Sequence, residues 1–167
     1  MVSIGILKER ADRRVVVLSP AGVERLGGKA TVLVQRDAGR AAGFTNEAYT
    51  AAGAQVVERE EEVINGANVL VSYDHHYLGG PLNGAKTFIG FFHFLGMPSK
   101  LDLYQRQGVS AYSLDLMPRT TLAQAMDVLS SVGSISGYQA VLLAAERSLA
   151  TVPMITSAGG TLRPANF

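Results

Sequence analysis

Short apolar runs alternate with amphipathic segments along most of this sequence. Six runs have the length of β-strands, and several are apolar at almost every position, as expected of strands covered on both faces. The predicted strands are Val2–Leu7, Thr31–Gln35, Gln55–Val57, Asn68–Ser72, Thr87–Phe92 and Val109–Tyr112. Such strands, separated by helical segments, predict an α/β fold with an open parallel sheet and crossover helices.

Helix signals lie between these runs. Proline in a first turn and glycine after a last turn are typical of helix ends. The predicted helices are Pro20–Leu26, a short helix from Thr45 to Gly53, Glu58–Asn65 and Pro98–Gln107. A fifth helical pattern runs from Thr121 to about Ala150. It is longer than one face of a small sheet requires, so we expect this helix to leave the first domain.

The domain organisation follows from that long helix. We expect residues 1–118 to form an α/β domain and residues 119–167 to hold a polar loop, a long linking helix and the start of a further domain. The tail, TVPMITSAGGTLRPANF, contains turn residues and stops as an apolar strand begins. The end of the sequence therefore looks unfinished.

Composition restricts the function further. The 167 residues are 47% hydrophobic and 17% charged, as in ordered globular proteins. A net charge of +1 argues against a nucleic-acid groove or a polybasic membrane patch. The absence of cysteine excludes disulfides and thiolate chemistry. We see no signal peptide and no apolar run near 18 residues, so we expect a cytoplasmic chain without direct membrane insertion.

The segment Met117–Ala140, MPRTTLAQAMDVLSSVGSISGYQA, carries more polar residues than an ordinary helix start requires. Thr121 and Gln124 have the spacing of a capping box, in which hydroxyl and amide satisfy free backbone N–H groups. Asp127 in the second predicted turn complements the positive end of the helix dipole. Capping alone can account for these residues.

A second interpretation of the same segment is a binding site. At 100° per residue, Gln124, Asp127 and Ser131 share one face of the predicted helix, with Ser130 at its edge. Arg119 precedes the helix and can fold over its first turn. A polar stripe at a helix N-terminus suits recognition of an anion or an amide.

Three other groups carry chemistry. His93 ends an apolar strand, where ligands of open α/β sheets bind, although position alone favours a partly buried, hydrogen-bonded histidine. Adjacent histidines such as His75 and His76, which follow Asp74, rarely point at one ion, so we predict no metal site. The basic stretch 8–14 is mostly a solvated loop, in which one arginine could hold a carboxylate or phosphate.

Nucleotide-binding and hydrolase signatures are missing from these 167 residues. No strand is followed by G-x-G-x-x-G, and neither a P-loop nor G-x-S-x-G occurs. The sequence alone therefore carries no dinucleotide fingerprint.

The stretch PRTTLAQAMDVLSSVGSISGYQAV resembles a family motif, P-R-x-x-x-x-Q-x-M-D-x-L-S-S followed by G-Y-x-A-V. The family is the NAD(H)-binding α subunit of the proton-translocating nicotinamide nucleotide transhydrogenases. IGILKER, LSPAGVERL, GFTNEAYTAAGAQV and PMITSAGGTLRPA add to the resemblance, which is collinear over nearly the whole chain and loosest between Ser72 and Ala85. It implies a flavodoxin-like first domain and a long C-terminal helix that leads towards a missing Rossmann domain.

The resemblance also implies roles for four residues. Arg119 and Asp127 would orient the nicotinamide and ribose of NAD(H), Gln124 would bridge towards an NADP(H)-binding partner domain, and Ser130 would support the loop. The implied reaction is that of a Re/Si-specific NAD(P)⁺ transhydrogenase: hydride passes from NADH to NADP⁺ while a membrane-embedded partner moves protons. A homodimer is implied as well, with a location in the cytoplasm or at the inner membrane through that partner.

Two alternatives remain at this point. Alanine dehydrogenases share the first domain of this superfamily and use an arginine, a lysine and a histidine after its first, fourth and fifth strands. The matching positions here are Arg14 (with Arg13 as the alternative), Ser72 and His93, so the lysine is missing, which counts against amino-acid oxidation. The runner-up is an alanine-dehydrogenase-like fragment with Arg14 and His93 at its substrate. The third hypothesis is a non-catalytic interaction domain.

Overall fold

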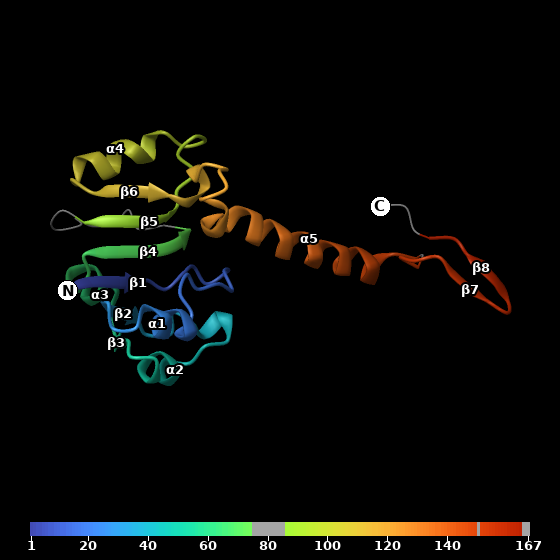
Figure 1. The fold of residues 1–167 in the computed structure, drawn as a ribbon, viewed down its shortest axis with the longest axis horizontal. Coiled ribbons are helices and arrows are strands. Elements are labelled where there is room, and N and C mark those ends of the chain that lie inside the picture. Colours follow the sequence, from blue (N-terminus) through green and yellow to red (C-terminus); the bar gives the residue numbers. More distant parts are fainter. Residues whose placement is uncertain (75–85, 150, 165–167) are drawn as a thin grey trace. The chain divides into compact units, whose positions relative to one another are not determined.

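The computed structural model describes residues 1–74, 86–149 and 151–164 (Figure 1). The chain forms two compact units, Met1–Met117 and Pro118–Phe167. The first unit holds a parallel sheet and four α-helices, and the second holds one long helix and a β-hairpin.

The first unit is an α/β fold around a six-stranded parallel sheet in the order β3-β2-β1-β4-β5-β6 (Figure 1). This topology confirms the predicted open parallel sheet. The strands are β1 (Val2–Ile6), β2 (Ala30–Gln35), β3 (Gln55–Val57), β4 (Val69–Asp74), β5 (Thr87–Phe91) and β6 (Ser110–Ser113). The helices are α1 (Pro20–Leu26), α2 (Asn46–Ala51), α3 (Glu60–Gly66) and α4 (Ser99–Arg106), with short 3-10 turns η1 (Arg40–Ala42) and η2 (Leu114–Leu116).

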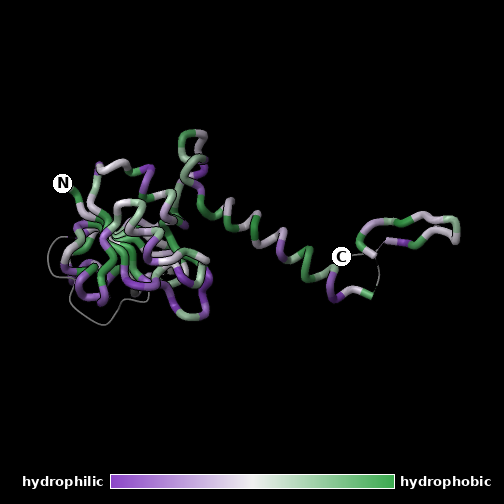
Figure 2. Tube along the Cα trace, turned by 90° about the horizontal axis from the view of Figure 1, so that it is seen from below, coloured by the Kyte–Doolittle hydropathy of each residue, from purple (hydrophilic) through white to green (hydrophobic). Residues whose placement is uncertain are grey.

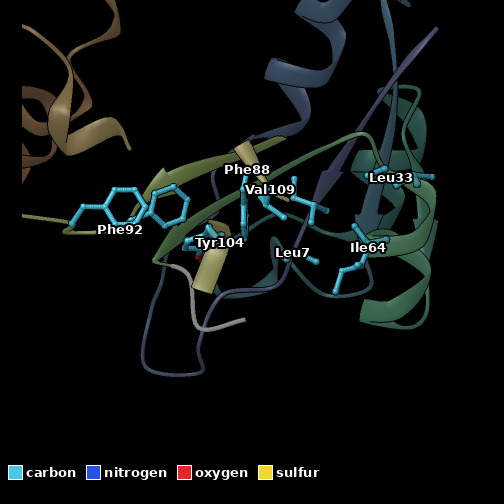
Figure 3. Close-up of a cluster of buried hydrophobic side chains, with 11 residues drawn as sticks. Leu7, Leu33, Ile64, Phe88, Phe92, Tyr104 and Val109 are labelled. Carbon is cyan, nitrogen blue, oxygen red and sulfur yellow. The ribbon is translucent and has the colours of Figure 1, made fainter. Parts of the chain in front are cut away.

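Each face of the sheet has its own apolar core. On one face, α3 and α4 contribute to an apolar cluster that runs from Leu33 and Ile64 to an aromatic part, in which the rings of Phe92 and Tyr104 lie 5.2 Å apart (Figure 3). Phe88, which is fully buried, packs against both rings. On the other face, α1 and α2 contribute Val23 and Tyr49. Burial on both faces explains why the strands read as nearly continuous apolar runs.

The helix ends of this unit follow the sequence signals. Ser19 caps α1 by accepting the N–H of Gly22, and Gly27 closes it in the left-handed conformation at φ 55°. Thr45 caps α2 in the same way. Predicted and observed ends differ by one or two residues at α3 and α4, which is ordinary fraying.

The long helix α5 (Val128–Arg147) begins seven residues later than predicted. Turns and the 3-10 segment η3 (Gln124–Met126) precede it, so the predicted capping box is wrong. Asp127 is the actual N-cap. The Gln124 N–H donates to the Thr120 carbonyl rather than to the Thr121 hydroxyl, whereas the Ser130 N–H donates to the Asp127 carboxylate.

The composition of α5 bears on the membrane prediction. Its first 18 residues carry no charge, and serine, glycine and alanine separate the larger apolar residues (Figure 2). By length and composition alone, α5 passes as a membrane span, although such helices also occur in proteins that do not enter membranes. The prediction that no apolar run approaches 18 residues concerned uninterrupted runs, and the absence of a membrane-spanning segment stays a prediction.

The tail forms an antiparallel hairpin that the sequence patterns above did not predict. Strands β7 (Ile155–Ser157) and β8 (Gly160–Leu162) pair across a turn that ends at Gly160, whose φ is 121°. A glycine pair between two short β-forming stretches is the signal that could have indicated it.

Candidate functional site

The polar segment forms a pocket within the second unit. A cavity of about 410 Å³ is lined by Pro118, Arg119, Gln124, Asp127, Ser130 and Ser131. All four residues that the resemblance assigned to the nicotinamide site therefore line one cavity. Their grouping is a finding, whereas their contact with a nucleotide stays a prediction.

Asp127 organises the helix side of this pocket. Its Oδ1 accepts the backbone N–H of Ser130 at 3.0 Å, and its Oδ2 accepts the Ser130 hydroxyl at 2.6 Å. These two hydrogen bonds, followed by the charge of Arg119, lower the pKa of the Asp127 carboxyl below its usual value of 3.8. The carboxylate is therefore ionised at neutral pH.

Backbone turns, rather than a helix, bring Gln124 into the pocket. The carbonyl of Thr120 accepts the N–H groups of Ala123 and Gln124, and the carbonyl of Gln124 accepts the N–H of Asp127. The helical-wheel argument for a shared face is therefore wrong for Gln124, which precedes α5. Two successive tight turns produce the same grouping.

The pocket offers both donors and acceptors. Among the described residues, no hydrogen bond or ion pair uses the side chain of Arg119 or Gln124, and both side chains are exposed. A guanidinium and an amide can donate to a carbonyl, hydroxyl or phosphate oxygen, while Asp127 keeps a negative charge nearby. The pocket can therefore bind a ligand that carries both hydrogen-bond acceptors and hydrogen-bond donors.

His93 lies where expected, directly after β5, but its surroundings differ from the favoured interpretation. It is exposed rather than partly buried, and its φ of 55° is left-handed, which is uncommon for a residue other than glycine. Asp115 stabilises this turn, because its Oδ1 accepts the N–H groups of Phe92 at 3.2 Å and His93 at 3.4 Å, together with the hydroxyl of Ser113.

Arg14, the other residue of the runner-up hypothesis, is exposed in the loop after β1. No hydrogen bond among the described residues joins it to His93. Ser72, at the expected lysine position, is buried, and its hydroxyl donates to Glu9 at 3.1 Å. Glu9 also accepts the N–H of Tyr73 at 2.5 Å. Sequence reasoning missed this buried glutamate because charged residues in a basic loop are usually solvated.

The metal prediction is only partly covered by the structure. His75 and His76 lie outside the described residues. Within residues 1–74, 86–149 and 151–164, no group of three or more histidine, aspartate or glutamate side chains is placed to hold a metal ion.

Comparison with known proteins identifies the family. Residues 5–136 match the family described as "Alanine dehydrogenase/PNT, N-terminal domain". The chain belongs to this family. Among its relatives, the first part of the NAD(P) transhydrogenase subunit alpha of Rhodospirillum rubrum is 31% identical, over 98% of this chain and 45% of the relative. "NAD(P) transhydrogenase subunit alpha" of Cereibacter sphaeroides is 33% identical over 66% of this chain and 21% of the relative.

Solved structures agree with this assignment. The transhydrogenase of Sinorhizobium meliloti matches 98% of this chain and 50% of its own with a TM-score of 0.85 and 28% identity. An L-alanine dehydrogenase matches 68% of this chain and 32% of its own, with a TM-score of 0.62 and 26% identity. The Rhodospirillum rubrum and Sinorhizobium meliloti matches, at 98% of this chain, extend across the polar segment and α5, which supports the transhydrogenase hypothesis over the two alternatives. The chain spans about half the length of the Rhodospirillum rubrum relative.

Proposed function

We propose that this chain is the N-terminal part of the NAD(H)-binding subunit of a Re/Si-specific transhydrogenase, and that its pocket receives the nicotinamide end of NAD(H). The observation that carries the proposal is the cavity that unites Arg119, Gln124, Asp127 and Ser130. The match of nearly the whole chain to transhydrogenase subunits supports the same conclusion.

The chemistry requires positioning rather than an acid or a nucleophile. When bound, NADH supplies the hydride, and NADP⁺ on a partner domain accepts it. Transfer is fast only when the two nicotinamide rings are held close and aligned. Arg119 and Asp127 orient the nicotinamide and its ribose, Gln124 reaches towards the NADP(H) domain, and Ser130 supports the loop.

The proposal includes an assembly. The subunit functions as a homodimer on the cytoplasmic side of the inner membrane and attaches there through a membrane-embedded, NADP(H)-binding partner. It binds no nucleic acid, in line with a net charge of +1, and does not itself insert into the membrane. The 167-residue chain alone binds NAD(H) weakly or not at all, because it carries no glycine-rich turn to hold a pyrophosphate. Calorimetry that finds micromolar affinity would contradict that last point.

A complete subunit tests the function. Residues 1–167 are joined to the remaining portion of the Rhodospirillum rubrum relative and mixed with the NADP(H)-binding domain of the same organism. We expect NADH-dependent reduction of an NADP⁺ analogue, without NADH oxidation by pyruvate plus ammonia. Absence of hydride transfer, or activity with pyruvate and ammonia instead, would refute the proposal.

Matched variants locate the site in that assay. Arg119→Gln and Gln124→Ala are each expected to lower the hydride-transfer rate about tenfold, because the loss of one hydrogen bond costs about 1–1.5 kcal/mol. Arg147→Gln and Gln139→Ala change the same residue types on α5 outside the pocket and serve as controls. Equal losses in the site and control variants would show that the pocket does not contact the nucleotide.

A further inference from the structure

The sheet of the first unit has an open edge at β3, the last strand in its order, which lies beside α2 (Figure 1). The carbonyl of Val57 accepts the N–H of Arg36 at 2.8 Å, so the backbone of Val57 faces β2. The backbone groups of successive strand residues point to opposite sides, so Val56 directs its N–H and C=O away from the sheet. Within the described part of the chain, these two groups have no hydrogen-bond partner.

A cavity of about 520 Å³ adjoins this open edge on the side of the sheet that α2 covers. It is lined by Arg36, Asn46, Glu47, Thr50, Ala51 and Val56. The cavity is therefore a groove between α2 and β3, with the side chains of Ala51 and Val56 as its apolar part. A peptide that adds to a sheet edge requires unpaired backbone groups and a pocket for one of its side chains, and this groove provides both.

Most polar side chains of the groove already have partners. The side-chain amide of Asn46 exchanges two hydrogen bonds with Asp37, at 2.9 and 3.1 Å. The guanidinium of Arg36 forms an ion pair with Glu58, which neutralises its charge. The hydroxyl of Thr50 donates to the carbonyl of Asn46 at 3.1 Å, so only its lone pairs remain for a ligand.

Glu47 differs from these side chains, because no ion pair among the described residues uses its carboxylate. Hydrogen bonds from its own backbone N–H and from the Thr45 hydroxyl lower the pKa of the Glu47 carboxyl, so it is ionised at neutral pH. The groove therefore offers hydrogen-bond acceptors and one negative charge without a counter-ion. This combination suits a lysine or arginine side chain, whose methylene groups can cover the apolar part.

We propose that this groove docks an extended, basic peptide segment of a partner protein. The segment adds to the sheet through the N–H and C=O of Val56, and its lysine or arginine side chain lies over Val56 and Ala51 and reaches the Glu47 carboxylate. The groove belongs to the first unit. The proposal therefore goes beyond the function proposed for the pocket of the second unit and does not depend on it.

The length of β3 sets the strength of this contact. The strand has three residues, and only Val56 directs its backbone groups to the open edge. Short edge strands are one way in which proteins limit unwanted pairing. Two backbone hydrogen bonds and one exposed ion pair give a weak contact, so the test requires peptide at millimolar concentration.

The test is an NMR titration of the isotope-labelled 167-residue chain with the capped peptide Ser-Val-Lys-Val-Thr-Ser. We expect shifts of the amide signals of Val56 and of the α2 residues that line the groove. Glu47→Gln should weaken binding about twofold to fivefold, the contribution of one exposed ion pair. Glu24→Gln, which removes an exposed carboxylate on α1 outside the groove, is the matched control and should leave the affinity unchanged. A peptide with glutamate in place of lysine should bind more weakly than the original peptide.

Two N-methylated peptides isolate the strand pairing without any change to the protein. Methyl groups on alternate backbone nitrogens block one edge of the peptide strand, and methyl groups on the other set block the opposite edge. One methylated peptide should lose binding and the other should keep it. Equal behaviour of the two would overturn the proposed pairing. The same shifts with lysine amide alone would indicate a site for a small cation, and the absence of shifts around Val56 would exclude the groove; either result would overturn the proposal.

Discussion

Gly90 in β5 lies where two strands approach so closely that no side chain fits between them. A Cβ atom at Gly90 would lie 2.5 Å from the backbone carbonyl oxygen of Ser72 in β4, whereas ordinary contact begins at 3.4 Å. The obstacle is backbone, so β4 and β5 must separate by about 0.9 Å to accept a methyl group. The Ser72 hydroxyl, bonded to Glu9, would move as well.

The expected cost of Gly90→Ala follows from this geometry. Overpacking costs about 1–3 kcal/mol, and weakening the Ser72 hydrogen bonds adds about 1 kcal/mol. With a urea dependence of about 2 kcal/mol/M, the unfolding midpoint should fall by about 1–2 M. Tyrosine fluorescence can follow the unfolding of the first unit, because Tyr49 and Tyr104 are buried there and the chain has no tryptophan.

Gly96→Ala is the matched control, because the nearest atom to its added Cβ, the His93 carbonyl oxygen, lies 3.7 Å away. Its stability should stay within about 0.5 kcal/mol of the original chain. Equal midpoints for Gly90→Ala and Gly96→Ala would refute the steric reasoning.

Three further predictions concern the first unit. Lys86→Met should lower the free energy of unfolding by about 1–3 kcal/mol in urea, since the buried ammonium donates to the backbone carbonyls of Ile64 and Ala67; unchanged stability would contradict this. Burial acts to raise the pKa of Asp115, but its hydrogen bonds outweigh burial and lower the pKa below 3.8. The stabilisation by the Asp115 carboxylate is therefore complete above pH 3.8 and lost as the pH falls through the lowered pKa. Asp115→Asn should make the free energy of unfolding depend less on pH in this acid range, and an unchanged pH dependence would contradict the prediction. His93→Gly should raise the melting temperature by relieving the left-handed strain of about 1 kcal/mol, whereas His93→Ala should not, and equal effects would refute the strain.

The central strands were largely predictable because helices cover both of their faces, and β2 buries Val32, Leu33 and Val34 in succession. The predicted strand Thr87–Phe92 agrees with β5 to within one residue. The helix start at Asp127 was not predictable from spacing alone, since Thr121 offered an equally good cap seven residues before Val128. In the structure, backbone turns accepted by Thr120 and Gln124 precede Asp127, and the helix begins after them.

The candidate site was found from its residue types and its motif, but not from its geometry. A helical stripe was the wrong reason for grouping Gln124 with Asp127, although both line the cavity. The hydrogen bonds between Asp127 and Ser130 could not be predicted, because they depend on the position of the helix N-cap, which the sequence analysis placed at Thr121. Glu9 and His93 could not be placed from the sequence. Whether Glu9 is buried and His93 exposed depends on contacts between segments far apart in the chain, which local sequence patterns do not contain.

Nuclear Overhauser effects between NADH and the complete subunit test the central claim most directly. With the nicotinamide ring in the cavity, its ring protons should show cross-peaks to side-chain protons of Arg119, Gln124 or Ser130, and these should disappear on competition with NAD⁺. Binding of NADH without any such cross-peak, together with unchanged signals for residues 118–131, would contradict the assignment of this pocket to the nicotinamide.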